Sequence, residues 1–134
     1  MQYDLAQLVK DALLILGCDP AMGQGLDSHS TITLDFEDLP SLLISVQDEQ
    51  VWLWSRVAEY SETVLAHKAS DILTLLMQSD DTLIGGHPSL AEGEGYLELR
   101  GVLTPAMLEN GERMAEALTQ FFDRLSALAQ LIRQ

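Results

Sequence analysis

Hydrophobic and polar positions along the chain follow two periods, one typical of helices and one typical of strands. Apolar residues recur at helical spacing in three segments, 4–17, 61–79 and 105–133. Short extended patterns, most with period two, occupy five segments, 30–36, 41–47, 51–57, 87–92 and 96–103. The order α-β-β-β-α-β-β-α has no βαβ alternation. It predicts one α+β domain over residues 1–134, with a mostly antiparallel five-stranded sheet and three flanking helices.

Capping and helix-breaking residues set the expected helix ends. Asp4 and Ser61 stand where N-caps of the first two helices are expected. Gly17 is placed to end the first helix, and the turn-rich segment 18–29 that follows is expected to be a loop. Pro105 suits the first turn of a last helix that runs to about Arg133. Pro88 lies inside the expected fourth strand and weakens it.

The third predicted strand is apolar on both of its faces. Trp52 and Trp54 fall on one face, and Val51 and Leu53 fall on the other. A strand of this kind needs cover on both faces. We expect a helix of this chain to cover one face and a partner to cover the other, which makes Trp54 a candidate residue of a functional apolar surface.

The second predicted helix has an unusually wide apolar surface. Its apolar residues cover more of the circumference than the stripe of roughly 100° that a one-sided surface helix needs. Two interpretations remain open, a dimer interface and a central core helix. For the dimer interface, the expected contact residues are Leu65, Ile72, Leu73 and Leu76.

The chain is strongly acidic, with 7 Lys and Arg against 21 Asp and Glu and a net charge of −14. Nucleic acid and anionic lipid both need cationic contacts, so neither is an expected partner. No apolar run is long enough for a membrane span, and the N-terminus lacks a signal-peptide pattern. The single cysteine, Cys18, suits a reducing cytosol, and the expected location is cytoplasmic.

No catalytic or metal-binding constellation stands out in the sequence. The three histidines, His29, His67 and His87, have none of the spacings that place two ligands on one helix face. An enzyme that uses His29 with Asp27 or Glu92 is the weakest of the functional hypotheses, because nothing in the spacing supports it. No cofactor is expected.

Several ordered motifs resemble a known family. They are Gly17-Cys18-Asp19-Pro20, Asp27-Ser28-His29-Ser30-Thr31-Ile32, Ile44-Ser45-Val46 with Asp48, Val51-Trp52-x-Trp54, and Gly111-Glu112, Ala117-Leu118 and Phe121 near the end. Together they cover nearly the whole chain. The chain resembles the type III secretion effector chaperones of class IB, and among them the InvB-type chaperones of bacteria.

The resemblance implies a homodimer joined largely through the second helix and nearby strands. It also implies a ligand, the N-terminal chaperone-binding segment of one or more secreted effectors, held in an extended, secretion-competent form. Delivery to the secretion ATPase is part of the implied function, and catalysis is not. The alternative is a non-catalytic α+β dimer that regulates another protein or binds a small ligand.

An extended peptide can add a strand to a sheet edge while its apolar side chains fill adjacent pockets. The expected effector-binding groove therefore combines the first helix with the first strand. Its candidate residues, together with the tryptophan of the third strand, are Leu5, Leu8, Val9, Ile32, Leu34, Phe36 and Trp54. Each of the aliphatic residues among them also suits an ordinary core position.

Overall fold

The computed structural model describes residues 4–18 and 31–134. Its helices are α1 (Leu5–Ile15), α2 (Glu62–Met77), the short 3-10 helix η2 (Pro105–Leu108) and α3 (Gly111–Arg133). Its strands are β1 (Ile32–Leu34), β2 (Leu42–Gln47), β3 (Gln50–Glu59), β4 (Ser89–Gly93) and β5 (Tyr96–Val102). The predicted loop at 18–29 falls, from residue 19 on, outside the described residues.

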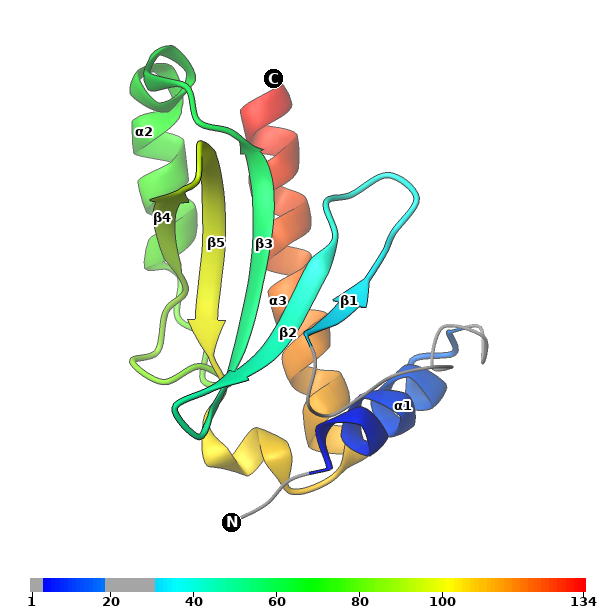
Figure 1. The fold of residues 1–134 in the computed structure, drawn as a ribbon. Helices are drawn as coiled ribbons and strands as arrows, with labels where there is room; N and C mark the ends of the chain where they lie inside the picture. Colours follow the sequence, from blue (N-terminus) through cyan, green and yellow to red (C-terminus); the bar gives the residue numbers. More distant parts are fainter. Residues whose placement is uncertain (1–3, 19–30) are drawn as a thin grey trace.

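The five strands form one antiparallel sheet in the order β1-β2-β3-β5-β4 (Figure 1). β1 and β4 are therefore its two edges. The fourth strand begins directly after Pro88, where the missing N–H of proline removes no hydrogen bond from the ladder. This arrangement confirms the predicted α+β class, the antiparallel sheet and the element order.

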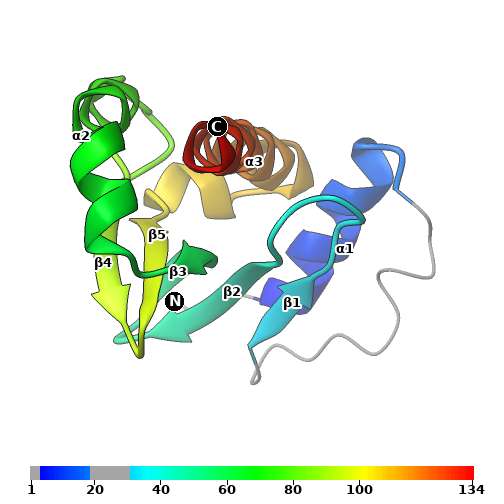
Figure 2. The same ribbon diagram turned by 90° about the horizontal axis from the view of Figure 1, so that it is seen from above.

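All three long helices lie on the same side of the sheet (Figure 2). α3 runs over the centre of the sheet, with α2 beside the β4 edge and α1 beside the β1 edge. None of the described elements covers the opposite side of the sheet. We call that side the open face.

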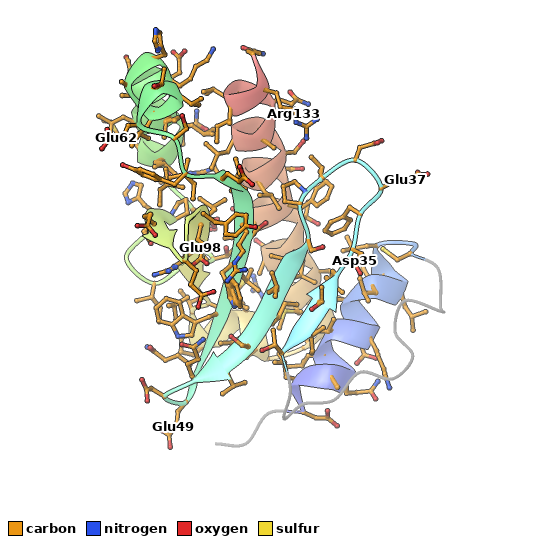
Figure 3. All side chains as sticks on the ribbon, turned by 45° about the horizontal axis from the view of Figure 1, so that its top comes forward. Asp35, Glu37, Glu49, Glu62, Glu98 and Arg133 are labelled. Atoms are coloured by element: carbon orange, nitrogen blue, oxygen red, sulfur yellow. The ribbon has the colours of Figure 1, made fainter. Side chains whose placement is uncertain are left out.

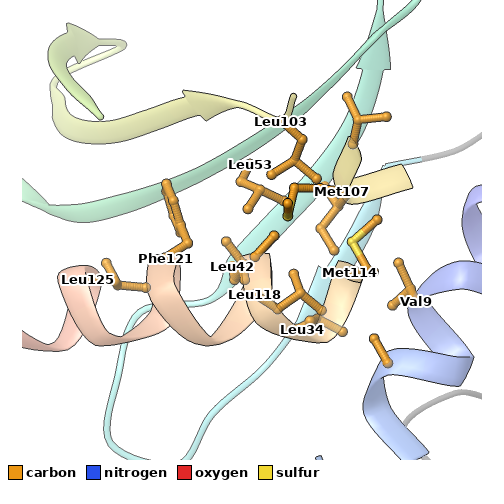
Figure 4. Close-up of a cluster of buried hydrophobic side chains, with 14 of the residues drawn as sticks. Val9, Leu34, Leu42, Leu53, Leu103, Met107, Met114, Leu118, Phe121 and Leu125 are labelled. Atoms are coloured by element: carbon orange, nitrogen blue, oxygen red, sulfur yellow. The ribbon is translucent and has the colours of Figure 1, made fainter. Parts of the chain in front are cut away.

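The core lies between α3 and the covered face of the sheet (Figure 4). Phe121, Leu118 and Leu125 of α3 are at most 3% exposed, and Leu42 and Leu53 of the sheet are at most 1% exposed. The apolar residues of α3 recur at helical spacing, whereas those of each strand alternate. Both periods therefore direct side chains into one shared layer.

The predicted last helix is divided in two by the structure. Residues from Pro105 form η2, and α3 begins only after Asn110, whose φ of −161° is extended. The Asn110 side chain accepts a hydrogen bond of 2.9 Å from the backbone N–H of Arg113. As an N-cap, Asn110 pairs a backbone N–H of the first turn that has no partner within the helix. A new helix therefore begins after it.

α1 and α3 are in tight contact at Gly111. A Cβ atom at this position would lie 2.6 Å from Cβ of Asp11 and 3.4 Å from its carbonyl carbon. Only glycine fits at this distance without a shift of α1. The contact fixes the N-terminal end of α3 against α1.

The substitution Gly111→Ala is expected to lower the free energy of unfolding by about 1–3 kcal/mol, because the added methyl group overlaps Asp11. Urea denaturation followed by circular dichroism measures this change. The matched control is Gln130→Ala, an exposed position of the same helix, which should change stability by less than about 0.5 kcal/mol. Equal effects of the two variants would contradict the tight packing.

The β2–β3 hairpin turns through two residues with left-handed backbones. Asp48 has a φ of 53° and Glu49 a φ of 65°, the pattern that a type I′ turn requires. The turn is favourable for the twist of the hairpin, but the second position normally holds glycine. A side chain with a Cβ is strained there.

The substitution Glu49→Gly is expected to raise the free energy of unfolding by about 1 kcal/mol by removing that strain. The control Gln50→Gly, within β3, should instead lower it by roughly 0.5–1 kcal/mol. Thermal and urea unfolding of both variants check the opposite signs. Destabilisation by Glu49→Gly would show that the turn does not govern this hairpin.

Candidate functional site

An apolar cavity of about 230 Å³ opens beside the β1 edge of the sheet. It lies where the end of α1, the first two strands and the middle of α3 meet. Its lining residues are Leu13, Leu16, Cys18, Leu34, Phe36, Leu42, Leu118, Thr119 and Phe122. Only Thr119 brings a hydroxyl group, so the cavity suits an apolar side chain.

Local structure explains why these side chains converge. Leu34 and Leu42 are cross-strand partners, and both point toward the helices because they share one phase of the strand alternation. Leu13 and Leu16 are three residues apart at the end of α1, on neighbouring parts of its surface. Leu16 is 43% exposed, so it stands at the mouth of the cavity.

Two aromatic rings form part of the cavity wall. Phe36, just beyond β1, meets Phe122 of α3 edge to face, with ring centroids 4.8 Å apart and planes at 63°. This geometry is favourable for the quadrupoles of both rings. It fixes the wall without closing the cavity, because both side chains remain partly exposed.

The cavity lies next to an edge strand. β1 pairs with β2 and with no other described strand. An edge strand presents backbone N–H and C=O groups that a further extended segment can pair with. Cavity and edge together can therefore hold an extended peptide by its backbone and by one apolar side chain.

The predicted effector-binding residues are distributed over four environments. Leu34 and Phe36 line the cavity, and Leu8 is partly buried at the edge of the core. Leu5, Val9 and Ile32 are at most 2% exposed within the core. Trp54 lies on the open face of the sheet, opposite the face that bears the cavity.

Sequence reasoning missed most of the cavity wall. Leu118, Thr119 and Phe122 come from a helix nearly a hundred residues further along the chain, and only its packing places them here. The one local signal was Leu16, an apolar residue directly before the predicted helix stop at Gly17, which the structure places just beyond the end of α1. Its apolar side chain has no core position to fill.

α2 is peripheral and not a central core helix, so that interpretation of its wide apolar surface was wrong. Ile72 is its only buried residue, whereas Leu73 and Met77 are 60% and 66% exposed. Leu65 and Leu76 are half-buried against the core. Exposed apolar side chains of this size, on a helix beside the sheet edge, form a surface that a partner can cover.

An arginine of α3 holds the end of α2 in place. The guanidinium group of Arg124 donates a 3.0 Å hydrogen bond to the backbone carbonyl of Leu75, in the last turn of α2. A cation at this end is also favourable for the helix dipole. The exposed side of α2 is thus presented on a fixed helix.

Residues 4–18 and 31–134 contain no group of three or more His, Cys, Asp or Glu side chains that could hold a metal ion. The hypothetical pair His29 and Asp27 lies outside the described residues. Within the described part of the chain, no helix has the length and hydropathy needed to span a membrane.

Comparison with known proteins identifies the family. Residues 17–94 match the model of the Invasion protein B family. The chain is also 40% identical to the surface presentation of antigens protein SpaK of Salmonella typhimurium (strain LT2). The match spans 131 residues and covers 97% of each of the two chains. The SpaK protein of Salmonella typhi shows the same identity and coverage. This chain belongs to the Invasion protein B family.

Solved structures share the fold of this family member at low sequence identity. A chain of the ExsC–ExsE complex matches with a TM-score of 0.59 and 15% identity, and the match covers 93% of this chain and 87% of that one. A chain of the heterodimeric ExoU–SpcU complex from the type III secretion system of Pseudomonas aeruginosa matches with a TM-score of 0.58 and 16% identity. This second match covers 92% of this chain and 96% of that one. The resemblance predicted from the sequence is confirmed at the level of family and fold.

Proposed function

We propose that this protein is a cytoplasmic chaperone of type III secretion in bacteria. It binds the N-terminal segment of one or more secreted proteins, which we call clients, and keeps that segment extended for delivery to the secretion ATPase. The function is binding without catalysis and without a cofactor. The observation that carries the proposal is the apolar cavity that opens beside β1, an edge strand of the sheet that the described residues form.

The family and the similar structures support this proposal. ExsC was solved with ExsE, and SpcU was solved with ExoU, so each structure is a complex of two different proteins. The complex of SpcU with ExoU comes from a type III secretion system. A protein with the same fold and an exposed apolar cavity is suited to hold a partner in the same general way. The match to SpaK over 97% of each chain supports the assignment over the whole domain.

Two kinds of interaction would contribute to client binding, backbone hydrogen bonds to β1 and apolar contacts in the cavity. Backbone hydrogen bonds to the outer edge of β1 carry no side-chain information, so they tolerate different client sequences. An apolar client side chain in the cavity contributes about 1.5–3 kcal/mol and sets the register. Ordering a flexible segment opposes binding, so the client must bury a large area.

A homodimer would supply that additional area. Leu73 and Met77, with exposed fractions of 60% and 66%, form an apolar surface on one side of α2 that a second copy can cover. Leu65, Ile72 and Leu76 lie behind it and support the helix from the core side. Two copies joined at α2 would present two cavities to one client.

The substitution Leu16→Asp is expected to weaken client capture by about 10-fold or more, because it places a carboxylate at the mouth of the apolar cavity. The bait is the purified protein in lysate of its own host, with clients identified by mass spectrometry and the stoichiometry of complexes measured by light scattering. The matched control is Leu14→Asp, which changes a 62% exposed residue of the same helix that does not line the cavity.

Capture of a secreted protein by wild type and Leu14→Asp, but not by Leu16→Asp, is the expected result. Equal capture by all three proteins would remove the cavity from the binding site. Retention of a regulator and no secreted protein would favour the alternative function.

The substitution Leu73→Asp is expected to convert the homodimer into a folded monomer, because it buries a carboxylate without a partner in the proposed interface. Its 60% exposure in the single chain means that the monomer itself should stay folded. Sedimentation analysis with circular dichroism checks both statements, and Leu14→Asp again serves as the control. A folded Leu73→Asp protein that is still dimeric would exclude this interface.

A further inference from the structure

The open face of the sheet carries an aromatic and charged cluster that the proposed function does not use. Trp52, Trp54 and Arg56 of β3 lie beside Glu98 and Arg100 of β5 in the ladder. Both tryptophans are half-buried although no described element lies over them. The sequence predicts cover on this face, and among the described residues this chain does not provide it.

Glu98 organises the two arginines. Its side chain, labelled in Figure 3, is only 8% exposed. Its carboxylate accepts a hydrogen bond of 3.3 Å from Nε of Arg56 and one of 3.0 Å from Nε of Arg100. Nη2 of Arg100 donates to the same carboxylate. A Cβ at Gly93 would come within 2.9 Å of this carboxylate, so glycine leaves the space that Glu98 occupies.

Arg56 is held from three directions. Its Nη2 lies 2.7 Å from Oε2 of Glu94, and its guanidinium carbon lies 5.0 Å above the centre of the Tyr96 ring. The hydrogen bonds that Arg56 donates to Glu98 and then to Glu94 raise the pKa of Arg56. Both guanidinium groups therefore keep a fixed orientation, which lowers the entropy lost when they bind a ligand.

A cavity of about 370 Å³ lies over this cluster. It is lined by Gln47, Trp52, Trp54, Arg56, Gly93, Glu94, Glu98 and Arg100. Nη1 of Arg56 and Nη1 of Arg100 have no hydrogen bond to any described residue, so the four N–H groups on these two nitrogens remain for a ligand. Donors beside aromatic surfaces suit an acidic group with an apolar neighbour.

The charge distribution makes this place unusual on the molecule. The chain has a net charge of −14, and two of its seven cationic residues meet here. Three other arginines already have partners, because Arg113 pairs with Glu116, Arg124 binds a carbonyl of α2 and Arg133 binds the carbonyl of Asp38. Glu98 is enclosed by the two guanidinium groups, and Glu94 is 81% exposed to screening solvent. The charge on the rest of the chain disfavours an acidic peptide. In this cluster two guanidinium groups balance Glu94 and Glu98 and still offer N–H donors.

We propose that the open face is a second client-binding site, which takes an Asp or Glu side chain of the client on Arg56 and Arg100 and a neighbouring apolar side chain against Trp52 and Trp54. This inference rests on the proposed function and deepens it. The cavity at β1 selects an apolar side chain, and the open face selects an acidic residue followed or preceded by an apolar one. Together they would fix two points of one client segment.

Tryptophan fluorescence reports on this face alone, because Trp52 and Trp54 are the only tryptophans of the chain. A random-peptide phage library is selected on the dimeric wild-type protein, and the enriched peptides are synthesised without tryptophan. Peptides with an acidic residue beside an apolar one are expected to shift the emission of the protein. Replacing Glu by Gln in these peptides should weaken binding about 10-fold or more. Because this substitution is in the peptide, the protein itself is unchanged.

Protein variants separate this site from the cavity at β1. Arg100→Gln should weaken the acidic peptides about 10-fold or more, whereas Leu16→Asp should leave them bound. The matched control is Arg113→Gln, which removes an arginine from an exposed ion pair on α3 and should have no effect. Circular dichroism verifies that each variant is folded.

Three results would overturn the inference. If every selected peptide depends on Leu16 and none changes the emission, the cavity at β1 is the only client site and the proposed function stands alone. If Arg100→Gln and the Glu-to-Gln peptides bind as before, the cluster is structural. If Trp54→Ala abolishes dimerisation, the face belongs to a second copy.

Binding of acidic peptides with no effect of Leu16→Asp on any peptide would instead uphold this site and remove the cavity from the proposed function.

Discussion

One-sided packing of the helices on the sheet is the constraint on which the rest of the structure depends. α3 provides the apolar stripe that buries the covered face of the sheet, and α1 and α2 extend this layer at its two ends. Because α1 lies at the β1 edge, its last turn, the strand and α3 enclose a cavity that they do not fill. Because α2 lies at the other edge with little over it, its outer side stays apolar and exposed. Because no described element covers the open face, the two tryptophans there have no cover from this part of the chain.

The fold was largely predictable from the sequence, since each element follows from local periodicity. Trp52 and Trp54 were assigned to the face opposite Val51 and Leu53, and the ladder confirms it. The break between η2 and α3 was not predicted, because Pro105 is a suitable first residue for a helix. The signal that decided it was the N-cap Asn110, three residues before the amide that it binds.

The candidate site was predictable only in part. The period-two pattern assigns Leu34 to the helix side of β1, but the sequence alone does not distinguish a core position from a cavity wall. That distinction depends on Phe122 and Leu118, which only tertiary packing brings to β1. The cluster on the open face was also missed. Arg56 is far in the sequence from Glu98 and Arg100, and its contact with them depends on the pairing of β3 with β5.

The central claim is that a client adds a strand to the outer edge of β1 while it fills the adjacent cavity. Hydrogen–deuterium exchange of the chaperone, alone and in complex with a captured secreted protein, tests it most directly. The account predicts that amides within Ile32–Leu34 exchange more slowly in the complex, together with those of the neighbouring cavity wall around Phe36. Unchanged exchange at β1 in a complex that is demonstrably formed would contradict it.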